Sequence, residues 1–259
     1  MMHLQNIIPE IGLTQESTVS SLQYGRMIQD AILCDRDGLK RHFGHYALLY
    51  EPKNILSGDF YFYSRKKNLK YLAVCDCAGH GTSGALLTIL GHNLLQRALN
   101  KFTNLDDIVN FVNQQFVKTF DHVEFMQGMD MIIVCIDENN KKISYSGARR
   151  PLWVLRNQHV HIFRTNRSSV GDDPTFEFKS TQLEYLPGDR IFLFSDGYTD
   201  QFNELDHVKM GQKSLRESLI KLENVPLTAI GTKLHSELLN FKGSNVFTDD
   251  VLLLGIELK

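Results

Sequence analysis

Acidic residues recur in this chain where apolar runs meet loops. They are Asp59 in SGDFY, Asp76 in AVCDCAGHG, Asp196 in FLFSDGY, and Asp249 with Asp250 in FTDDVLLLGI. A carboxylate left unpaired at the end of a buried strand is costly, so each needs an arginine, a lysine or a metal ion as its partner. Taken one at a time, each aspartate could instead serve a turn or a cap.

The segments around these aspartates hold few basic residues, which favours a metal ion as the partner. Aspartate and backbone carbonyl oxygens are hard ligands, suited to Mg²⁺ or Mn²⁺. Several carboxylates that converge predict a two-metal site, in which the ions lower the pKa of a bridging water and hold a phosphoryl oxygen. The chain has no G-x-S-x-G elbow, G-x-x-x-x-G-K-[ST] loop or C-x₅-R loop. We therefore predict hydrolysis without a nucleophile from the protein.

Closely spaced strands and paired helices are predicted to position these aspartates. Strand patterns cover residues 46–50, 59–64, 70–76, 131–137, 142–146, 152–156, 159–163, 190–195 and 251–257. Helical patterns cover residues 83–99, 105–120 with Asn104 as N-cap, 214–222 and 227–241, and residues 34–42 are predicted as a polar loop. Strands in runs and helices in pairs predict an α+β fold, in which helices cover the outer faces of antiparallel sheets.

An amphipathic helix is predicted ahead of the main domain, from Thr14 to Leu33. Gly25 in its middle should weaken it by about 1 kcal/mol relative to alanine, so this position is a flexible point or a close packing contact. The apolar stripe of the helix could meet a partner helix, although a plain packing helix is the alternative. We divide the chain into an N-terminal extension, residues 1–44, and a domain, residues 45–259.

Composition bounds the class of protein. With 259 residues, 42% hydrophobic and 22% charged, the chain suits one large globular domain, or at most two small ones. A net charge of −2 provides no general field for nucleic acid or anionic membranes, so we expect neither as a partner. No stretch approaches the roughly 18 apolar residues of a membrane helix, and no export signal is visible. Four dispersed cysteines fit reduced thiols and a cytoplasmic protein.

Six segments carry a resemblance to a known family. They are PKNILSGDFYFY, DCAGHGTSGALLT, GMDMIIVCID, SGARRPLWVLRN, FLFSDGYTDQF and TDDVLLLGI. From about Tyr46 to the C-terminus, their order and spacing resemble the PPM-type metal-dependent protein phosphatases, specifically the sporulation stage II protein E branch. The preceding SLQYGRMIQDAIL resembles the linker helix that joins this domain to a sensor. The resemblance implies a four-layer α/β/β/α sandwich of two antiparallel sheets flanked by helices.

The resemblance also implies ligands for two Mn²⁺ or Mg²⁺ ions. Asp59 matches the aspartate of the family's G-D-F/Y motif. Asp76 matches the aspartate of D-x-x-G-H-G that bridges both ions, and the backbone carbonyl of Cys77 falls where the family uses the next oxygen. Asp196 matches the aspartate of the S/T-D-G motif. Asp249 matches the first aspartate of the D-D motif that opens the last strand.

Other residues near the expected site carry open alternatives. Asp250 follows Asp249 and is the less favoured ligand of the two. His80 matches a general-acid histidine of the wider family at a different offset, so proton transfer and a structural hydrogen bond both stay open. Gly79 and Gly81 are expected to permit a tight backbone before the next helix, whose free N–H groups could face phosphate.

Substrate contacts are expected from loops over the metal site, at residues 168–173 and 198–213. Four arginines could engage phosphate or an acidic partner, although solvation is the plainer expectation for them: Arg149, Arg150, Arg164 and Arg167.

The implied activity is that of a Mn²⁺- or Mg²⁺-dependent protein serine/threonine phosphatase, in which metal-activated water attacks phosphoserine or phosphothreonine directly. The resemblance suggests a phosphorylated regulatory protein as substrate, commonly a STAS-domain anti-sigma factor antagonist. A pseudo-phosphatase that binds phosphoprotein without turnover is the alternative. A two-metal nuclease or small-molecule phosphatase is a third, which would favour a basic groove or nucleotide pocket. Input could come from a sensor or activator in trans, or through a homodimer formed by the N-terminal helix.

Overall fold

The computed structural model describes residues 15–121, 128–205 and 207–259, so the expected helix start at Thr14 lies outside the described residues. Its strands form two antiparallel sheets. The first sheet runs in the order β1 (Tyr46–Glu51), β10 (Val251–Glu257), β9 (Arg190–Phe194), β6 (Leu152–Arg156) and β7 (His159–Phe163). The second runs in the order β2 (Asp59–Lys66), β3 (Leu69–Cys77), β4 (Met129–Asp137), β5 (Lys142–Ala148) and β8 (Thr181–Glu184).

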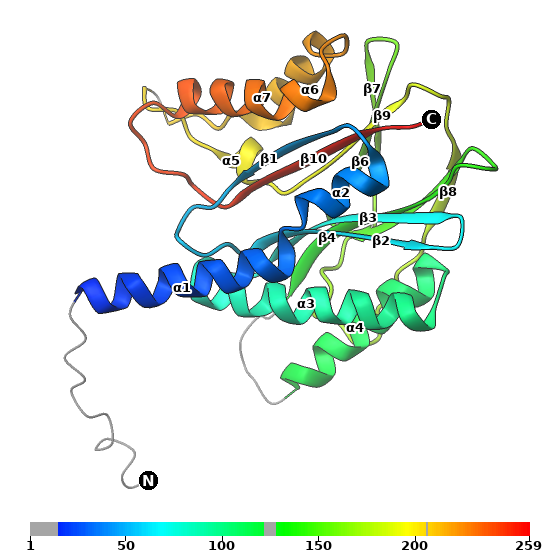
Figure 1. The fold of residues 1–259 in the computed structure, drawn as a ribbon, viewed down its shortest axis with the longest axis horizontal. Coiled ribbons are helices and arrows are strands. Elements are labelled where there is room, and N and C mark those ends of the chain that lie inside the picture. Colours follow the sequence, from blue (N-terminus) through cyan, green and yellow to red (C-terminus); the bar gives the residue numbers. More distant parts are fainter. Residues whose placement is uncertain (1–14, 122–127, 206) are drawn as a thin grey trace, which may run out of the picture.

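Helices cover the outer face of each sheet, so the predicted four-layer α/β/β/α sandwich is confirmed (Figure 1). The second sheet is covered by α3 (Thr82–Lys101) and α4 (Leu105–Phe120), and the first by α6 (Gly211–Lys221) and α7 (Leu227–Lys242). The side chain of Asn104 accepts from the N–H of Asp106 at 3.0 Å, which confirms the predicted N-cap of α4. Among the described helices, none is long and apolar enough to cross a membrane.

Alternation along the strands explains why the sandwich has separate apolar layers. In β3, Ala73 and Cys75 pack towards α3 and α4, whereas Leu72 and Val74 pack between the two sheets. Successive side chains of a strand point to opposite faces, so a strand that is apolar throughout can be buried on both sides. A third apolar layer lies between the first sheet and the helices α6 and α7.

The predicted N-terminal helix is present as α1 (Gln15–Leu33), which lies along α3 and β2. Its inner side is part of the core. The amide of Gln29 donates to the Ser57 carbonyl at 2.7 Å and to the Thr88 hydroxyl at 3.1 Å, and accepts from the Ser57 N–H at 3.1 Å. Leu33 is buried in the layer under α3. The helix therefore fixes the loop of residues 52–58, which leads into β2.

The loop predicted over residues 34–42 is wrong, because this segment forms the helix α2 (Arg36–Phe43). Asp35 caps it by accepting from the N–H of Gly38 at 2.7 Å, while Leu39 and Phe43 are buried between the sheets. Two buried residues one turn apart stabilise this short helix through tertiary packing, which its charged composition conceals. The sequence also gives no expectation of the four-residue elements β8 and α5 (Gly197–Asp200).

Three glycines permit a close backbone approach beside α3. A Cβ on Gly84 would lie 2.6 Å from the Gly79 carbonyl oxygen and 2.9 Å from the Gly58 Cα. A Cβ on Gly58 would lie 2.7 Å from the same carbonyl oxygen. The loop before β2, the loop after β3 and the first turn of α3 therefore touch through their backbones, with no room for a side chain.

Alanine at two helical glycines should have opposite effects on stability. Gly84→Ala places a methyl group against backbone atoms, and we expect this overpacking to cost about 1–3 kcal/mol. Gly25→Ala in α1 meets only the Leu56 side chain at 3.6 Å, so the gain in helix propensity should stabilise the protein by about 0.5–1 kcal/mol. Urea unfolding of both variants measures the difference. Equal effects of the two substitutions would contradict the close approach at Gly84.

Candidate active site

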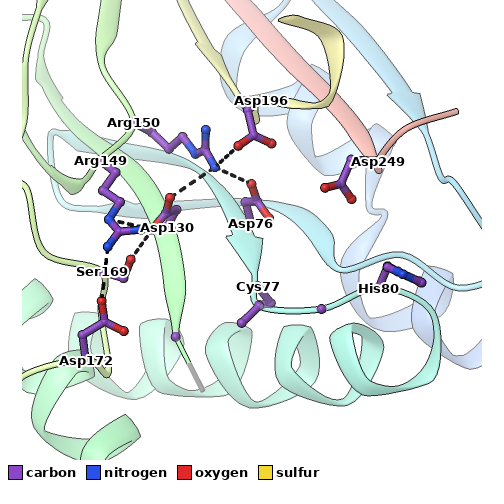
Figure 2. Close-up of a pocket in the computed structure, with 13 residues that line it drawn as sticks. Asp76, Cys77, His80, Asp130, Arg149, Arg150, Ser169, Asp172, Asp196 and Asp249 are labelled. Carbon is purple, nitrogen blue, oxygen red and sulfur yellow. Dashed lines mark hydrogen bonds and ion pairs between the residues drawn. The ribbon is translucent and has the colours of Figure 1, made fainter. Parts of the chain in front are cut away.

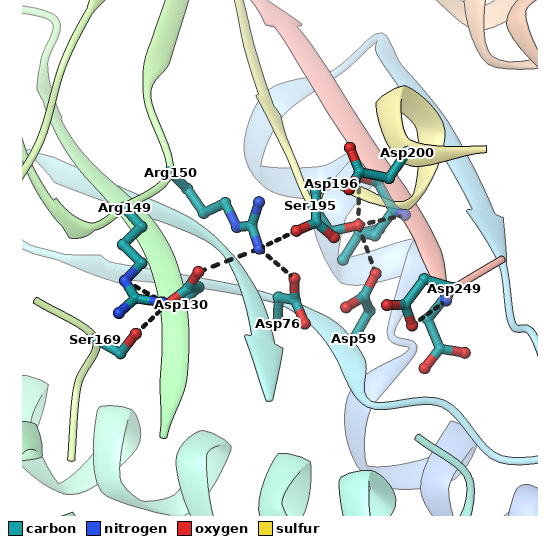
Figure 3. Close-up of polar contacts among 12 residues, drawn as sticks. Asp59, Asp76, Asp130, Arg149, Arg150, Ser169, Ser195, Asp196, Asp200 and Asp249 are labelled. Atoms are coloured by element: carbon teal, nitrogen blue, oxygen red, sulfur yellow. Dashed lines mark hydrogen bonds and ion pairs between the residues drawn. The ribbon is translucent and has the colours of Figure 1, made fainter. Parts of the chain in front are cut away.

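Three aspartates lie side by side at one end of the second sheet. Asp59 on β2 is directly opposite Asp76 on β3, and Asp76 is directly opposite Asp130 on β4. Val74 and Ile132, two residues along their strands, belong to the core between the sheets, so the three carboxylates share that inner face (Figure 3). Like charges directly opposite each other are destabilising, so this row of aspartates needs compensating groups.

The first sheet brings the residues that face this row. Ser195 and Asp196 directly follow β9, and Asp249 lies just before β10. The Ser195 hydroxyl donates to Asp59 Oδ2 at 2.6 Å and accepts from the Leu252 N–H at 3.0 Å. Asp59 is 1% exposed. The serine therefore ties the most deeply buried carboxylate of the second sheet to the first sheet.

One guanidinium nitrogen joins three of the carboxylates (Figures 2 and 3). Nη2 of Arg150 lies 2.8 Å from Asp76 Oδ2, 2.7 Å from Asp196 Oδ2 and 3.2 Å from Asp130 Oδ2. Arg150 comes from the connection between β5 and β6, outside the four aspartate motifs. A basic partner therefore does reach the aspartates, contrary to expectation. The expected solvation is wrong for Arg150, because only 15% of its side chain is exposed.

Burial raises the pKa values of the carboxyl groups. It raises the pKa of Asp76 to about 8, and Arg150 offsets only part of the effect. Burial, followed by repulsion from Asp76, raises the pKa of Asp59 well above its usual range. Burial also raises the pKa values of Asp130 and Asp249. Burial opposes the charge of Arg150, but the neighbouring carboxylates outweigh it and raise the pKa of this arginine.

A cavity of about 240 Å³ opens beside these groups. The predicted site residues that line it are Asp76, Cys77, His80, Asp196 and Asp249 (Figure 2). These residues come from the end of β3, the loop 78–81, the segment just after β9 and the segment just before β10. Strand ends from both sheets therefore meet at one cavity.

Two of the predicted ligands are absent from the described lining of this cavity. Asp250 is 3% exposed and accepts from the N–H groups of Lys53 and Gly58, each at 2.8 Å. Its carboxylate thus holds the loop of residues 52–58. Asp59 is directed to Ser195, between the sheets. Among the five predicted aspartates, Asp76, Asp196 and Asp249 are the ones that reach the cavity.

The loop after Asp76 has the tight backbone that was expected. Gly79 and Gly81 adopt φ values of 84° and 65°, in the left-handed region that favours glycine. The Cys77 N–H donates to the Gly58 carbonyl at 3.0 Å. His80 Nδ1 lies 3.0 Å from the Asn54 side-chain nitrogen, and the His80 side chain is exposed. Both roles suggested for His80 stay predictions.

Asp130 is the carboxylate at this site that sequence reasoning did not single out. It accepts a short hydrogen bond from Ser169, and Arg149 lies 4.0 Å from it and 3.6 Å from Asp172. Of the motif aspartates, Asp76 and Asp196 lie at strand ends, whereas Asp130 lies near the start of β4. In an antiparallel sheet the start of one strand lies beside the end of its neighbour, which is the signal that could have identified it. Ser169 and Asp172 belong to the loop expected over the site.

The donor chemistry of this cavity fits a divalent cation. Four buried or half-buried carboxylates, those of Asp76, Asp130, Asp196 and Asp249, surround it, and oxygen ligands of this kind suit Mg²⁺ or Mn²⁺. Burial outweighs the nearby charge of Arg150 and raises the pKa of Asp76 to about 8. Within the described residues no three acidic, histidine or cysteine side chains are drawn together around one point as ligands. Three of the carboxylates are instead directed to Arg150.

Two solved structures share this fold. The PP2C domain of SiaA from Pseudomonas aeruginosa has a TM-score of 0.89 and 25% identity, over 95% of this chain and 98% of that one. The PP2C domain of SpoIIE from Bacillus subtilis, with a fragment of its regulatory domain, has a TM-score of 0.70 and 16% identity, over 83% of this chain and 61% of that one. The chain therefore has the fold of a PP2C-type phosphatase domain, the class that the motifs predict.

The family follows from the sequence itself. The model of the stage II sporulation protein E (SpoIIE) family matches residues 68–259, and the chain belongs to this family. The predicted family is thus confirmed. A curated relative is the phosphoserine phosphatase RsbP of Bacillus subtilis, 28% identical over 155 residues, which are 58% of this chain. The matched region spans 38% of RsbP.

Without metal, the protein should lose stability as the pH rises from about 5 to 8. The pKa of Asp76 is raised to about 8, above the value near 4 of an unfolded aspartate, so here the folded state holds a proton that the unfolded state has released. Stability then falls with pH, by up to about 1.4 kcal/mol per unit for one such carboxyl. Urea titrations in EDTA measure this slope.

Asp76→Asn should reduce that slope, because the amide does not titrate, whereas Asp107→Asn at an exposed position on α4 should leave it unchanged. The raised pKa values of the other buried carboxyls will keep part of the slope. A metal-free stability that increases over the same pH range would contradict this account of the site.

Proposed function

We propose that this chain is a metal-dependent protein phosphatase that hydrolyses phosphoserine or phosphothreonine on a regulatory protein. The observation that carries the proposal is the meeting of carboxylates from two sheets at one cavity of about 240 Å³, in a chain of the SpoIIE family. Two Mn²⁺ or Mg²⁺ ions would supply Lewis-acid chemistry there, by activating water for direct attack on phosphorus.

The proposed ligands are Asp76, Asp196 and Asp249, with the backbone carbonyl of Cys77. Their support is that all four residues line the cavity. Asp76 would bridge the two ions, which agrees with its place between strand ends of the two sheets. Asp59 would support Asp76 from the neighbouring strand, and Asp250 would hold the loop in front of Asp59, because both are buried away from the cavity.

The cavity rim offers groups for the phosphate and for the leaving alcohol. We place Arg149 at the phosphate, since its side chain is half exposed and lines the cavity. Its φ of 60° is uncommon outside glycine and marks a locally constrained backbone. His80 would donate a proton to the leaving oxygen if its role is chemical, with Asn54 orienting its ring.

The substrate class rests on the relatives. RsbP is a phosphoserine phosphatase, and this chain resembles only part of that protein. We propose a phosphorylated STAS-domain protein as the substrate, together with a sensor or activator in trans. We also propose a cytoplasmic location, which the four cysteines support because all of them are free thiols, as expected in a reducing compartment.

A pseudo-phosphatase that binds phosphoprotein is the second candidate. The observation that favours it is Arg150, because a guanidinium among three carboxylates is what a site without metal would use. Against it, Asp76, Asp196 and Asp249 are all retained at the cavity. Turnover decides between the two candidates.

Asp76→Asn and Asp196→Asn should each reduce turnover of a phosphoserine peptide, on the order of a hundredfold or more, because each removes a charge that would hold the ions. Asp76→Asn should be the more harmful, since its carboxylate would be shared. Initial rates with Mn²⁺, with Mg²⁺ and with EDTA measure this, and Asp107→Asn is the matched control on an exposed surface.

EDTA should abolish the rate of the wild-type protein. A rate that persists in EDTA, or in both aspartate variants, would contradict the metal-dependent mechanism. Binding of the phosphopeptide without turnover in any metal would instead favour the phosphoprotein-binding module.

The outer face of α1 suits the regulatory role proposed for residues 1–44. Large apolar side chains are exposed there, among them Tyr24 at 66% and Met27 at 68%. With Ile28 and Ile32 they follow helical spacing, opposite the buried Gln29. We propose that a second copy of the chain covers this face. Deleting the helix would also remove Gln29 from the core, so substitutions on the outer face are the cleaner test.

Tyr24→Glu combined with Met27→Glu should convert a dimer to a monomer, because two charges would be buried in an apolar interface. Light scattering at micromolar concentration measures the mass, and circular dichroism checks that helix content is unchanged. Gln114→Glu, at an exposed polar position of α4, is the control. A wild-type protein that is monomeric under these conditions would rule out this interface.

A further inference from the structure

Arg150 contacts its carboxylates in a way that differs from a permanent ion pair. All three distances run to one nitrogen, Nη2, and in the described part of the chain its Nε is buried without a hydrogen-bond partner. Arg156 provides the comparison, because its Nε and Nη2 donate to the two oxygens of the buried Asp189 at 2.7 and 2.5 Å. The bidentate arrangement is the stronger one. The guanidinium of Arg150 is thus held by its charge through one atom, Nη2.

Nη2 of Arg150 occupies the position between two carboxylates where a metal ion would bind. Nη2 lies almost equally far from Asp76 on the second sheet and Asp196 on the first, at 2.8 and 2.7 Å. A divalent ion would bind the same oxygens at about 2.1 Å. The ion and the guanidinium are both cations, and in a partly buried site their repulsion is only weakly screened. The metal ion and the guanidinium therefore cannot both hold these two carboxylates at the same time.

We propose that Arg150 is a resident counter-ion of the metal-free site, and that a metal ion must displace its guanidinium from Asp76 and Asp196 in order to bind. This inference rests on the proposed function, because it takes these two aspartates as metal ligands. Arg150 is then a positioning residue that sets the affinity for metal. Its contribution to the metal-free protein is to hold together carboxylates that would otherwise repel one another.

Competition of this kind has a distinctive consequence. Removing the charge of Arg150 should destabilise the metal-free protein and, at the same time, tighten metal binding. An arginine with a merely structural role would weaken both, because the ligands would lose their positions. An arginine that supports bound metal would weaken binding alone.

The variant Arg150→Met keeps an apolar side chain and removes the charge. Calorimetric titration of the EDTA-stripped full chain with MnCl₂ should show a Kd lower than that of the wild type by roughly tenfold or more, the scale of one charge-assisted contact. The Tm in EDTA should fall, and the rise in Tm on adding Mn²⁺ should be larger than in the wild type. Arg150→Lys, which keeps a cation, should give a Kd between those of the wild type and Arg150→Met. It replaces Arg150→Met in the test if that variant does not fold.

Two control variants separate local competition from general charge and stability effects. Arg149→Met removes the same charge at the same cavity. Because Arg149 lies near Asp130 and Asp172 instead of Asp76 and Asp196, this substitution should change the Kd for Mn²⁺ less. Arg156→Met breaks a buried ion pair of another kind and should lower the Tm without tightening metal binding.

The outcomes distinguish this inference from the function on which it rests. Tighter Mn²⁺ binding with a lower metal-free Tm supports it, and so does binding that is seen in Arg150→Met alone. A wild-type protein that binds Mn²⁺ while Arg150→Met and Arg150→Lys bind it equally well or more weakly overturns the inference and leaves the proposed function standing. Failure of the wild type and of both variants to bind Mn²⁺ overturns the proposed metal site and the inference together.

Discussion

A row of like charges at the end of a hydrophobic core is the constraint on which the rest of this structure depends. Asp59, Asp76 and Asp130 are cross-strand neighbours on the face that packs between the sheets. Their repulsion is strong because little water screens it. Ser195 donates to the first of them, and Arg150 approaches the other two. Burial nevertheless raises the pKa of Asp76 to about 8, so without metal this carboxyl holds a proton near neutral pH, and a divalent cation would favour its ionised form.

The two-sheet architecture is what brings that charge to one place. In antiparallel sheets, strand ends and strand starts alternate along each edge, so β3 ends where β4 begins and β9 ends where β10 begins. Stacking the sheets then sets Asp76 opposite Asp196. The loops before β2 and after β3 must also approach the first turn of α3 closely. Gly58, Gly79 and Gly84 permit this approach because they carry no side chains. The cavity therefore follows from strand direction and backbone packing as much as from its carboxylates.

Local patterns in the sequence predict most of the strands and helices and the motif loops. They do not predict which side chains meet when they lie far apart in the chain. The alternation in β3 and the motif around Asp76 identify a buried strand that ends in a functional loop, and the family resemblance supplies the layer order. Arg150 is 74 residues from Asp76 in the chain, and only the folded sheets reveal that their side chains meet. The helix α2 was missed for the same reason, because Leu39 and Phe43 are stabilised by the core between the sheets and not by local periodicity.

The loop of residues 52–58 connects the helix α1 to the row formed by Asp59, Asp76 and Asp130. On one side, Gln29 of α1 holds both backbone groups of Ser57. On the other side, Asp250 accepts from the Gly58 N–H, while the Gly58 carbonyl accepts from the Cys77 N–H. The next residue is Asp59. Because each backbone group in this short path is already paired, a shift of α1 along α3 must either break a buried hydrogen bond or move the segment that carries the first aspartate of the row.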